Sequence, residues 1–192
     1  MAYFNTVAIG TSAGGLKALT ELLSHLPGDL PATVLVVQHL DPKHKSLIVE
    51  LLQKHCRLKI KTAEDGEPAE PSVAYIAPPN KHLLLADGKI SLSSSAFVHF
   101  SRPSIDLMFE SVAASKEGNV IGVILTGSGS DGAMGIKAIK EKGGTTIAQD
   151  PDTAEHGSMP AAAIATGMVD FVLPLEGIAP AIITLINEGD GV

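Results

Sequence analysis

The sequence predicts an α/β fold: a doubly wound, mainly parallel sheet with helices on both faces and a small antiparallel hairpin insert. Three observations predict it. Strand-like runs alternate along the chain with segments of helical period. Two of the runs, residues 33–38 and 119–125, are almost continuously apolar, as are strands buried on both faces of a parallel sheet. Glycine-rich turns separate several strands from the helices that follow them.

The composition indicates a globular protein. The chain has 192 residues, 45% hydrophobic and 18% charged, and we expect residues 1–192 to form a single domain. A net charge of −7 would repel nucleic-acid phosphates, so we expect no nucleic-acid partner. The lone Cys56 cannot form an intramolecular disulfide, and the N-terminus lacks the pattern of a secretion signal. No apolar run approaches the roughly 18 residues that span a bilayer, so we expect a cytoplasmic protein without membrane insertion.

The first part of the chain has the pattern strand, turn, helix, strand, helix. Residues 4–9 predict a strand that Gly10 ends. A helix follows, defined by leucines at helical spacing and ended by Pro27 and Gly28: Leu16, Leu19, Leu22, Leu23 and Leu26. Residues 33–38 form the second strand. The next helix should turn four side chains inward: Leu47, Ile48, Leu51 and Leu52.

The middle of the chain predicts an antiparallel insert. Its short strands are residues 72–77, 82–86 and 89–92, and Asp87-Gly88 between the last two is typical of a type I′ turn. Residues 102–115 then return to helical period, with Pro103 in the first turn. One stripe of this helix should lie in the core: Ile105, Met108, Phe109 and Val112.

The last part resumes the parallel pattern. The strand at residues 119–125 leads into the loop 126–132 (TGSGSDG) and a helix at 133–142 that Gly143-Gly144 ends. The remaining predicted elements are a strand at 145–148, a short helix near 160–166, a strand at 171–173 and a helix at 178–187.

Three polar residues follow three of the predicted parallel strands. Ser12 lies in Gly10-Thr11-Ser12-Ala13-Gly14, which fits G-x-S-x-G, His39 follows the second strand, and Asp131 lies in the glycine-rich loop. Because the carboxyl ends of parallel strands meet at one sheet edge, we expect these residues to converge there.

Serine, histidine and aspartate together suit nucleophilic catalysis. A serine hydroxyl needs an imidazole to take its proton, and a carboxylate fixes the tautomer of that imidazole. Ser12 would be the nucleophile, His39 the base and Asp131 the carboxylate. The backbone N–H groups of Ala13 and Ser128 are our candidates for an oxyanion site. The order Ser, His, Asp differs from the Ser, Asp/Glu, His order of α/β-hydrolases.

Each of these residues also has a purely structural interpretation. Ser12 could cap the helix at Gly14, His39 could be an ordinary hydrogen-bonding residue, and Asp131 could cap the helix that starts at Gly132. The other polar residues of the sequence do not indicate a metal site or a second nucleophile. The acidic residues Asp150, Asp152 and Glu155 lack ligand spacing and suit a solvated turn, and the remaining histidines and Cys56 show no metal or nucleophile pattern. We expect no metal and no cofactor, and the glycine turn lacks a phosphate-binding lysine.

Six motifs resemble those of the catalytic domain of the CheB family, the chemotaxis protein-glutamate methylesterases. They are VAIGTSAGG around Ser12, VVQHL around His39, YIAPPNKHLLL, SRPSIDLMFESVA, VILTGSGSDGAMG around Asp131 and QDPDTAEHGSMPAAA, and they run in the family's order over nearly the whole chain. The resemblance implies hydrolysis of glutamate γ-methyl esters on the cytoplasmic domains of methylated chemoreceptors, and also deamidation of receptor glutamines. It places the family's catalytic residues on Ser12, His39 and Asp131.

The chain departs from the best-known members at two positions near the expected oxyanion site. Ala13 stands where they have threonine, and Ser128 stands where they have methionine. The receiver domain that usually precedes the catalytic domain is absent, so we expect either a stand-alone enzyme controlled by a separate regulatory or methyltransferase partner, or a fragment of a longer chain.

The alternative function is a catalytically weak docking module on receptors. An acidic enzyme on an acidic substrate would need a basic patch, for which the candidates are Lys43, Lys45, Arg102 and Lys137. We expect a monomer.

Overall fold

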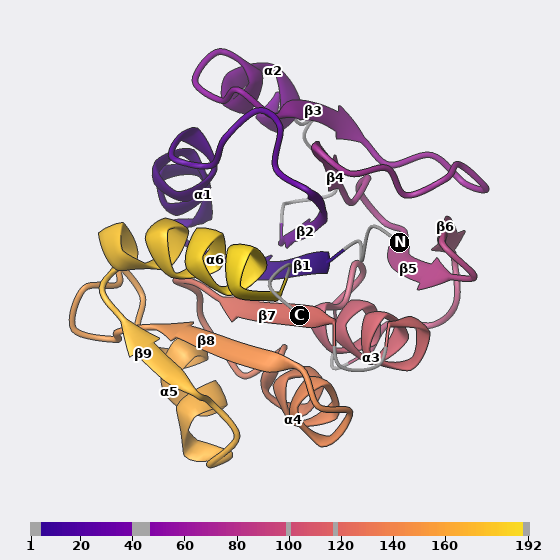
Figure 1. The fold of residues 1–192 in the computed structure, drawn as a ribbon. Coiled ribbons are helices and arrows are strands. Elements are labelled where there is room, and N and C mark those ends of the chain that lie inside the picture. The colour runs from indigo at the N-terminus through magenta and orange to yellow at the C-terminus, as the bar shows by residue number, and fades with distance from the viewer. Residues whose placement is uncertain (1–4, 40–46, 99–100, 117–118, 190–192) are drawn as a thin grey trace.

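The computed structural model describes residues 5–39, 47–98, 101–116 and 119–189. Seven strands form one sheet in the order β3-β4-β2-β1-β7-β8-β9, and every neighbouring pair is parallel (Figure 1). These strands are β1 (Asn5–Thr11), β2 (Ala32–Gln38), β3 (Lys59–Thr62), β4 (Val73–Ile76), β7 (Val120–Ile124), β8 (Thr145–Gln149) and β9 (Phe171–Leu173). A separate antiparallel hairpin joins β5 (His82–Ala86) to β6 (Lys89–Ser93). The fold class predicted from the sequence is confirmed.

Two hydrophobic cores lie on opposite faces of the sheet. Side chains alternate between the faces along each strand, so Val7 and Ile9 of β1 lie in one core and Ala8 in the other. One face is covered by α1 (Gly15–Ser24), α2 (Ile48–Gln53) and α6 (Leu175–Gly189). The hairpin covers the other face with α3 (Ile105–Ser115), α4 (Ala133–Glu141) and α5 (Ser158–Ala165). Burial on both faces explains why the central strands are apolar at nearly every position.

The helix that follows the antiparallel hairpin packs as predicted. The stripe Ile105, Met108, Phe109 and Val112 is fully buried against the sheet. Helix α3 begins at Ile105, three residues later than the pattern suggested, because Ser104 is its N-cap and its Oγ accepts the Leu107 N–H at 3.3 Å. Asp87 and Gly88 both have positive φ angles, 50° and 73°, as the predicted type I′ turn requires.

Two expectations about the first half of the chain are wrong, and one strand was missed. Strand β4, assigned to the antiparallel insert, pairs in parallel with β2 and β3, because its four side chains are buried within the main sheet. Strand β3 was not predicted, since its four residues alternate two lysines with a buried Ile60 and a threonine. Leu47 and Leu51 are 51% and 38% exposed rather than turned inward, because α2 is short and packs through Ile48 and Leu52.

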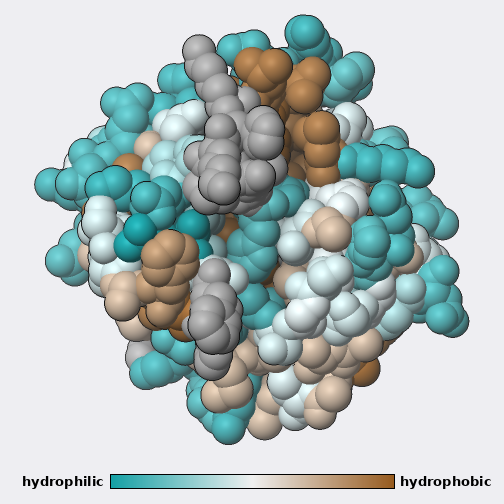
Figure 2. All heavy atoms as spheres, turned by 180° about the vertical axis from the view of Figure 1, so that it is seen from behind, coloured by the Kyte–Doolittle hydropathy of each residue, from teal (hydrophilic) through white to brown (hydrophobic). Residues whose placement is uncertain are grey.

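The molecular surface carries no continuous apolar face on the side shown in Figure 2, where brown patches are separated by hydrophilic side chains. The exposed large apolar residues of the described chain are Leu16, Leu47, Leu51, Phe97, Met134, Phe171 and Val172. Within the described ranges, no helix has the length and apolarity that crossing a membrane would need.

Candidate active site

The ends of β1 and β2 place Ser12 and His39 next to each other. Thr11 pairs with Gln38 as the last residues of the two parallel strands, so Ser12 and His39 follow at the same level. The His39 N–H donates to the Thr11 carbonyl at 3.1 Å, and the Ser12 N–H donates to the carbonyl of Thr126 after β7 at 3.0 Å. Strand β1 lies between β2 and β7. From β1 the chain first builds the sheet on one side, through β2, β4 and β3, and later on the other side, through β7, β8 and β9. This is the switch point at which ligands bind in open α/β sheets.

The turn after β1 leaves the Ser12 side chain free of a structural role in the described chain. Gly14, with φ of 78°, is the N-cap of α1 and allows the sharp reversal, and no side chain caps this helix. The Gly15 N–H donates to the Ser12 carbonyl at 2.9 Å and closes the turn. No hydrogen bond joins Ser12 Oγ to another described residue, His39 included. The interpretation of Ser12 as a helix cap is therefore wrong.

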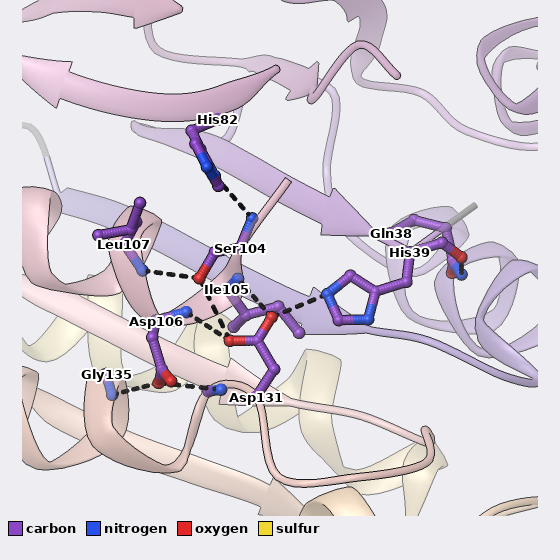
Figure 3. A network of polar contacts seen from close by, with 10 residues as sticks. Gln38, His39, His82, Ser104, Ile105, Asp106, Leu107, Asp131 and Gly135 are labelled. Carbon is purple, nitrogen blue, oxygen red and sulfur yellow. Dashed lines mark hydrogen bonds and ion pairs between the residues drawn. The ribbon is translucent and has the colours of Figure 1, made fainter. Parts of the chain in front are cut away.

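His39 and Asp131 form a direct pair, although 92 residues separate them (Figure 3). His39 Nε2 lies 2.8 Å from Asp131 Oδ2. An ionised carboxylate only accepts hydrogen bonds, so Nε2 carries the hydrogen and Nδ1 of a neutral ring is left as the proton acceptor. In the serine-protease template the two ring nitrogens have the opposite assignment.

The N-terminus of α3 holds the Asp131 carboxylate in place. Oδ2 accepts the Ile105 N–H at 2.8 Å, and Oδ1 accepts the Asp106 N–H at 2.9 Å and the Ser104 hydroxyl at 3.4 Å. Burial alone would raise the pKa of Asp131, but the hydrogen bonds from His39 and from the α3 backbone outweigh it and hold that pKa below its ordinary value. Asp131 is therefore ionised at neutral pH.

The sequence interpretation of Asp131 as the cap of the helix after it is wrong. Gly132, with φ of 99°, is the N-cap of α4, and the N-cap residue itself has no side chain to accept a hydrogen bond. Asp106, from the first turn of α3, supplies the acceptor instead: its Oδ1 receives the N–H groups of Gly132 at 2.9 Å and Gly135 at 2.7 Å. Sequence reasoning missed Asp106, because no periodicity distinguishes a buried acidic residue from an exposed one in a first helical turn.

One further buried residue, His82, extends the network away from His39 through Ser104. His82, placed by the sequence among scattered packing or surface histidines, is fully buried at the start of β5. Its Nδ1 accepts the Ser104 N–H at 3.1 Å, and its Nε2 faces the Ala96 carbonyl at 3.0 Å. A backbone N–H can only donate, so Nδ1 is unprotonated and Nε2 donates to Ala96. His82 thus fixes the residue that begins α3 (Figure 3).

Of the two oxyanion candidates, Ala13 directly follows Ser12, and Ser128 follows Gly127 in the loop after β7. The Ala13 carbonyl accepts the Thr126 hydroxyl at 3.0 Å, which ties the serine turn to the loop after β7. Gly127 packs directly on Ser12, because a Cβ at Gly127 would lie 2.8 Å from Ser12 Cβ. Among the described residues, no acceptor binds the backbone N–H of Ala13 or of Ser128.

A pocket of about 460 Å³ opens beside Ser12. Its lining combines the serine turn, the first turn of α1 and the end of β2: Ser12, Gly14, Gly15, Leu16, Lys17 and Gln38. Lys17 was not predicted as a site residue. In the described part of the chain, no three histidine, cysteine, aspartate or glutamate side chains gather as metal ligands.

Of the four residues suggested for a basic patch, the structure describes Arg102 and Lys137, and both have partners within this chain. Arg102 is bound within its own region: Nε and Nη2 donate to Asn80 Oδ1 at 2.9 and 2.7 Å, and the guanidinium lies 4.3 Å from the centre of the Phe97 ring. Lys137 pairs with Glu141 at 3.7 Å on α4. Lys43 and Lys45 lie outside the described residues.

A histidine paired with a buried carboxylate, beside a serine on a glycine turn at the switch point of a parallel sheet, is an arrangement typical of hydrolytic enzymes. Comparison with known proteins gives the family. The model of the CheB methylesterase family matches residues 7–182. The chain belongs to the CheB methylesterase family of enzymes, as its resemblance to that family implied.

Individual relatives agree with this assignment. A relative from Leptospira interrogans is 45% identical over 183 residues, which cover 95% of this chain and 95% of the relative. The protein-glutamate methylesterase/protein-glutamine glutaminase 2 of Burkholderia lata is 44% identical, and the match covers 95% of this chain but 54% of that longer protein. The crystal structure of the Thermotoga maritima CheB methylesterase catalytic domain superposes with a TM-score of 0.91 at 36% identity, covering 95% of this chain and 98% of the other.

Proposed function

We propose that this chain hydrolyses glutamate γ-methyl esters on the cytoplasmic domains of methylated chemoreceptors, with Ser12 as nucleophile, His39 as base and Asp131 as the orienting carboxylate. The observation that carries the proposal is the 2.8 Å contact of His39 Nε2 with Asp131, formed where the strand register places His39 next to Ser12. That contact leaves Nδ1 to accept the serine proton.

The proposed reaction has two steps. Ser12 Oγ attacks the ester carbonyl while its proton passes to His39 Nδ1, and the imidazolium then gives this proton to the departing methoxide. Methanol and a glutamyl-Ser12 ester result. Water, deprotonated by the same nitrogen, attacks this ester and releases glutamate and the serine hydroxyl. Asp131 stabilises the imidazolium that forms in each step.

The N–H groups of Ala13 and Ser128 are the proposed donors to the oxyanion in both steps. Each such donor contributes about 3–4 kcal/mol to transition-state stabilisation. Because the donors are backbone groups, alanine and serine side chains at these positions are compatible with the role. The same acyl-enzyme route would deamidate glutamine with ammonia as the leaving group, in keeping with the two-part name of the Burkholderia lata relative.

The partners and the setting complete the proposal. Methylated receptor helices are the substrate, residues 1–192 act as one catalytic domain that is monomeric and cytoplasmic, and a regulatory or methyltransferase protein, separate or in the same longer chain, controls it. Among the residues that the structure describes, Lys17 is the one cation that lines the pocket beside Ser12, and it would face the acidic substrate.

The test is release of methanol from a methylated chemoreceptor fragment by the wild type, Ser12→Ala and His39→Ala. We expect release by the wild type and none above background by either variant. Unchanged release by Ser12→Ala would overturn the assignment of the nucleophile. A folded wild type that binds the fragment without releasing methanol would support the docking alternative.

A further inference from the structure

We propose that Gln38 is a positioning residue that fixes Ser12 and His39 relative to each other; this inference rests on the proposed function. The side chain of Gln38 is almost fully buried between the ends of β1 and β2. Its Nε2 donates to the Ser12 carbonyl at 2.8 Å and to the His39 carbonyl at 2.8 Å. One planar amide group thus binds the backbone of both the proposed nucleophile and the proposed base.

The orientation of this amide follows from its partners. Two carbonyl oxygens face one end of the side chain, so that end must be the NH2 group, and each of its hydrogens has one acceptor. The opposite end, Oε1, is buried and has no hydrogen-bond partner in the described chain. A Cβ built on Gly15 would lie 1.8 Å from Oε1, so a Cα–H bond of Gly15 points at this oxygen.

An unpaired buried acceptor is costly, and an apolar side chain of similar size at position 38 would avoid the cost. The amide of Gln38 accepts this cost at Oε1 and makes two hydrogen bonds at Nε2, to the carbonyls of Ser12 and His39. Neither carbonyl can move away without breaking one of them. Because catalysis depends steeply on the placement of reacting groups, we infer that this bridge maintains the distance between the serine and the imidazole.

The first test replaces the donor. Gln38→Met keeps the length of the side chain and Gln38→Glu keeps its shape, but neither presents an NH2 group at neutral pH. We expect kcat for methanol release to fall about 10- to 100-fold in both variants, with KM within twofold of the wild type. Reaction of Ser12 with a small phosphonate ester should slow by a similar factor, although this probe makes no contact with a receptor-binding surface. Folded variants with wild-type kcat would overturn the proposal.

The second test displaces the amide without changing it. An alanine at Gly15 would put its Cβ into Gln38 Oε1 and, less closely, against Thr11 Oγ1, whereas the nearest atom to a Cβ at Gly177 of α6 is 3.6 Å away. Both glycines lie in the first turn of a helix, so Gly177→Ala is a matched control. We expect Gly15→Ala to lose kcat as the Gln38 variants do, and Gly177→Ala to keep it. Equal activity of the two alanine variants would contradict the proposal.

A third test uses the wild-type protein alone. Both side-chain N–H hydrogens of Gln38 are bonded to buried carbonyls, so in the wild type they should exchange with solvent at least 100-fold more slowly than those of an exposed glutamine. Exchange at the rate of an exposed amide would overturn the proposed bridge, whether or not the protein is an esterase. Conversely, slow exchange in a wild type without esterase activity would disprove the proposed function and, with it, the catalytic purpose of the bridge.

Discussion

Asp131 caps helix α3, on which Asp106 lies, and Asp106 caps helix α4, which begins two residues after Asp131. The carboxylate of Asp131 thus binds the N-terminus of the helix that carries Asp106, and the carboxylate of Asp106 binds the N-terminus of the helix that follows Asp131. The two carboxylates are buried and repel each other when both are ionised. Asp131 stays ionised because His39 and the α3 backbone donate to it, whereas burial, together with the charge of Asp131, raises the pKa of Asp106 to about 6 despite its hydrogen bonds.

Substituting Asp131 with asparagine should abolish most of the activity. An amide provides no charge for the imidazolium, and its NH2 group can favour the wrong tautomer of His39. By analogy with the serine-protease aspartate, we expect a loss of about 10⁴-fold in kcat, measured as methanol release. The fold should be kept, because the side-chain oxygen of the new amide can still accept a backbone N–H of α3. A folded variant with more than a tenth of the wild-type kcat would show that Asp131 is not part of the catalytic machinery.

The same variant should change the titration of Asp106. The charge of Asp131 is one of the causes that raise the pKa of Asp106, so removing that charge should lower this pKa from about 6 toward its ordinary value. The carboxyl carbon signal of Asp106, followed by NMR against pH, measures this directly. An unchanged midpoint would mean that the charge of Asp131 does not contribute to the pKa of Asp106.

The stability of the protein should depend on pH through Asp106. Its folded-state pKa of about 6 lies above the ordinary value of 3.8, so the folded state binds this proton more tightly than the unfolded state. The contribution of Asp106 to the free energy of unfolding is therefore greatest below pH 3.8 and is lost as the pH rises to about 6. The measurement is urea unfolding of the wild type and of Asp106→Asn at pH 4.5 and at pH 7. Between these values, the free energy of unfolding of the wild type should fall relative to that of Asp106→Asn.

Asp106→Ala provides the contrast to the asparagine variant. Asparagine retains an oxygen for the N–H groups of Gly132 and Gly135, but alanine leaves both donors without their acceptor. We expect Asp106→Ala to be less stable than Asp106→Asn by about 1 kcal/mol at every pH tested. Equal stability of the two variants would show that the cap of α4 contributes little.

Gly127→Ala should impair catalysis through crowding of the nucleophile. The added Cβ would lie 2.5 Å from Met159 Cε and 2.8 Å from Ser12 Cβ. Met159 has a flexible end that can move aside, but Ser12 Cβ is fixed by the turn and must shift with its backbone. We expect a fall in kcat of about 100-fold, measured as methanol release with Gly177→Ala as the control. Retained activity would mean that the loop after β7 gives way instead of Ser12.

Cys56 should be unreactive in the folded protein. Burial raises the pKa of its thiol to about 11, so almost no thiolate is present at pH 8. We expect iodoacetamide to leave the activity unchanged and to label Cys56 only in urea, with mass spectrometry as the measurement. Rapid labelling without denaturant would indicate local opening near the end of α2.

The sequence by itself determined the alternation of strands and helices, because apolar runs buried on both faces can only be the central strands of a covered parallel sheet. It also determined that Ser12, His39 and Asp131 follow three such strands, and their shared sheet edge follows from parallel pairing. The prediction of β4 in the insert was wrong because a short apolar strand has the same pattern in either sheet.

Only the tertiary structure decided how the polar groups pair. Asp131 caps α3 rather than α4, Asp106 caps α4, and Gln38 bridges Ser12 and His39; nearly all of these contacts join residues about 25 or more positions apart. The first N–H groups of any helix lack an acceptor within the helix, and this can be known from the sequence. Which side chain accepts them depends on how the helices pack. The pairing of His39 Nε2 with Asp131 has the same origin, since Ile105 of α3 packs against Gly10 of β1 and the α3 backbone holds the carboxylate there.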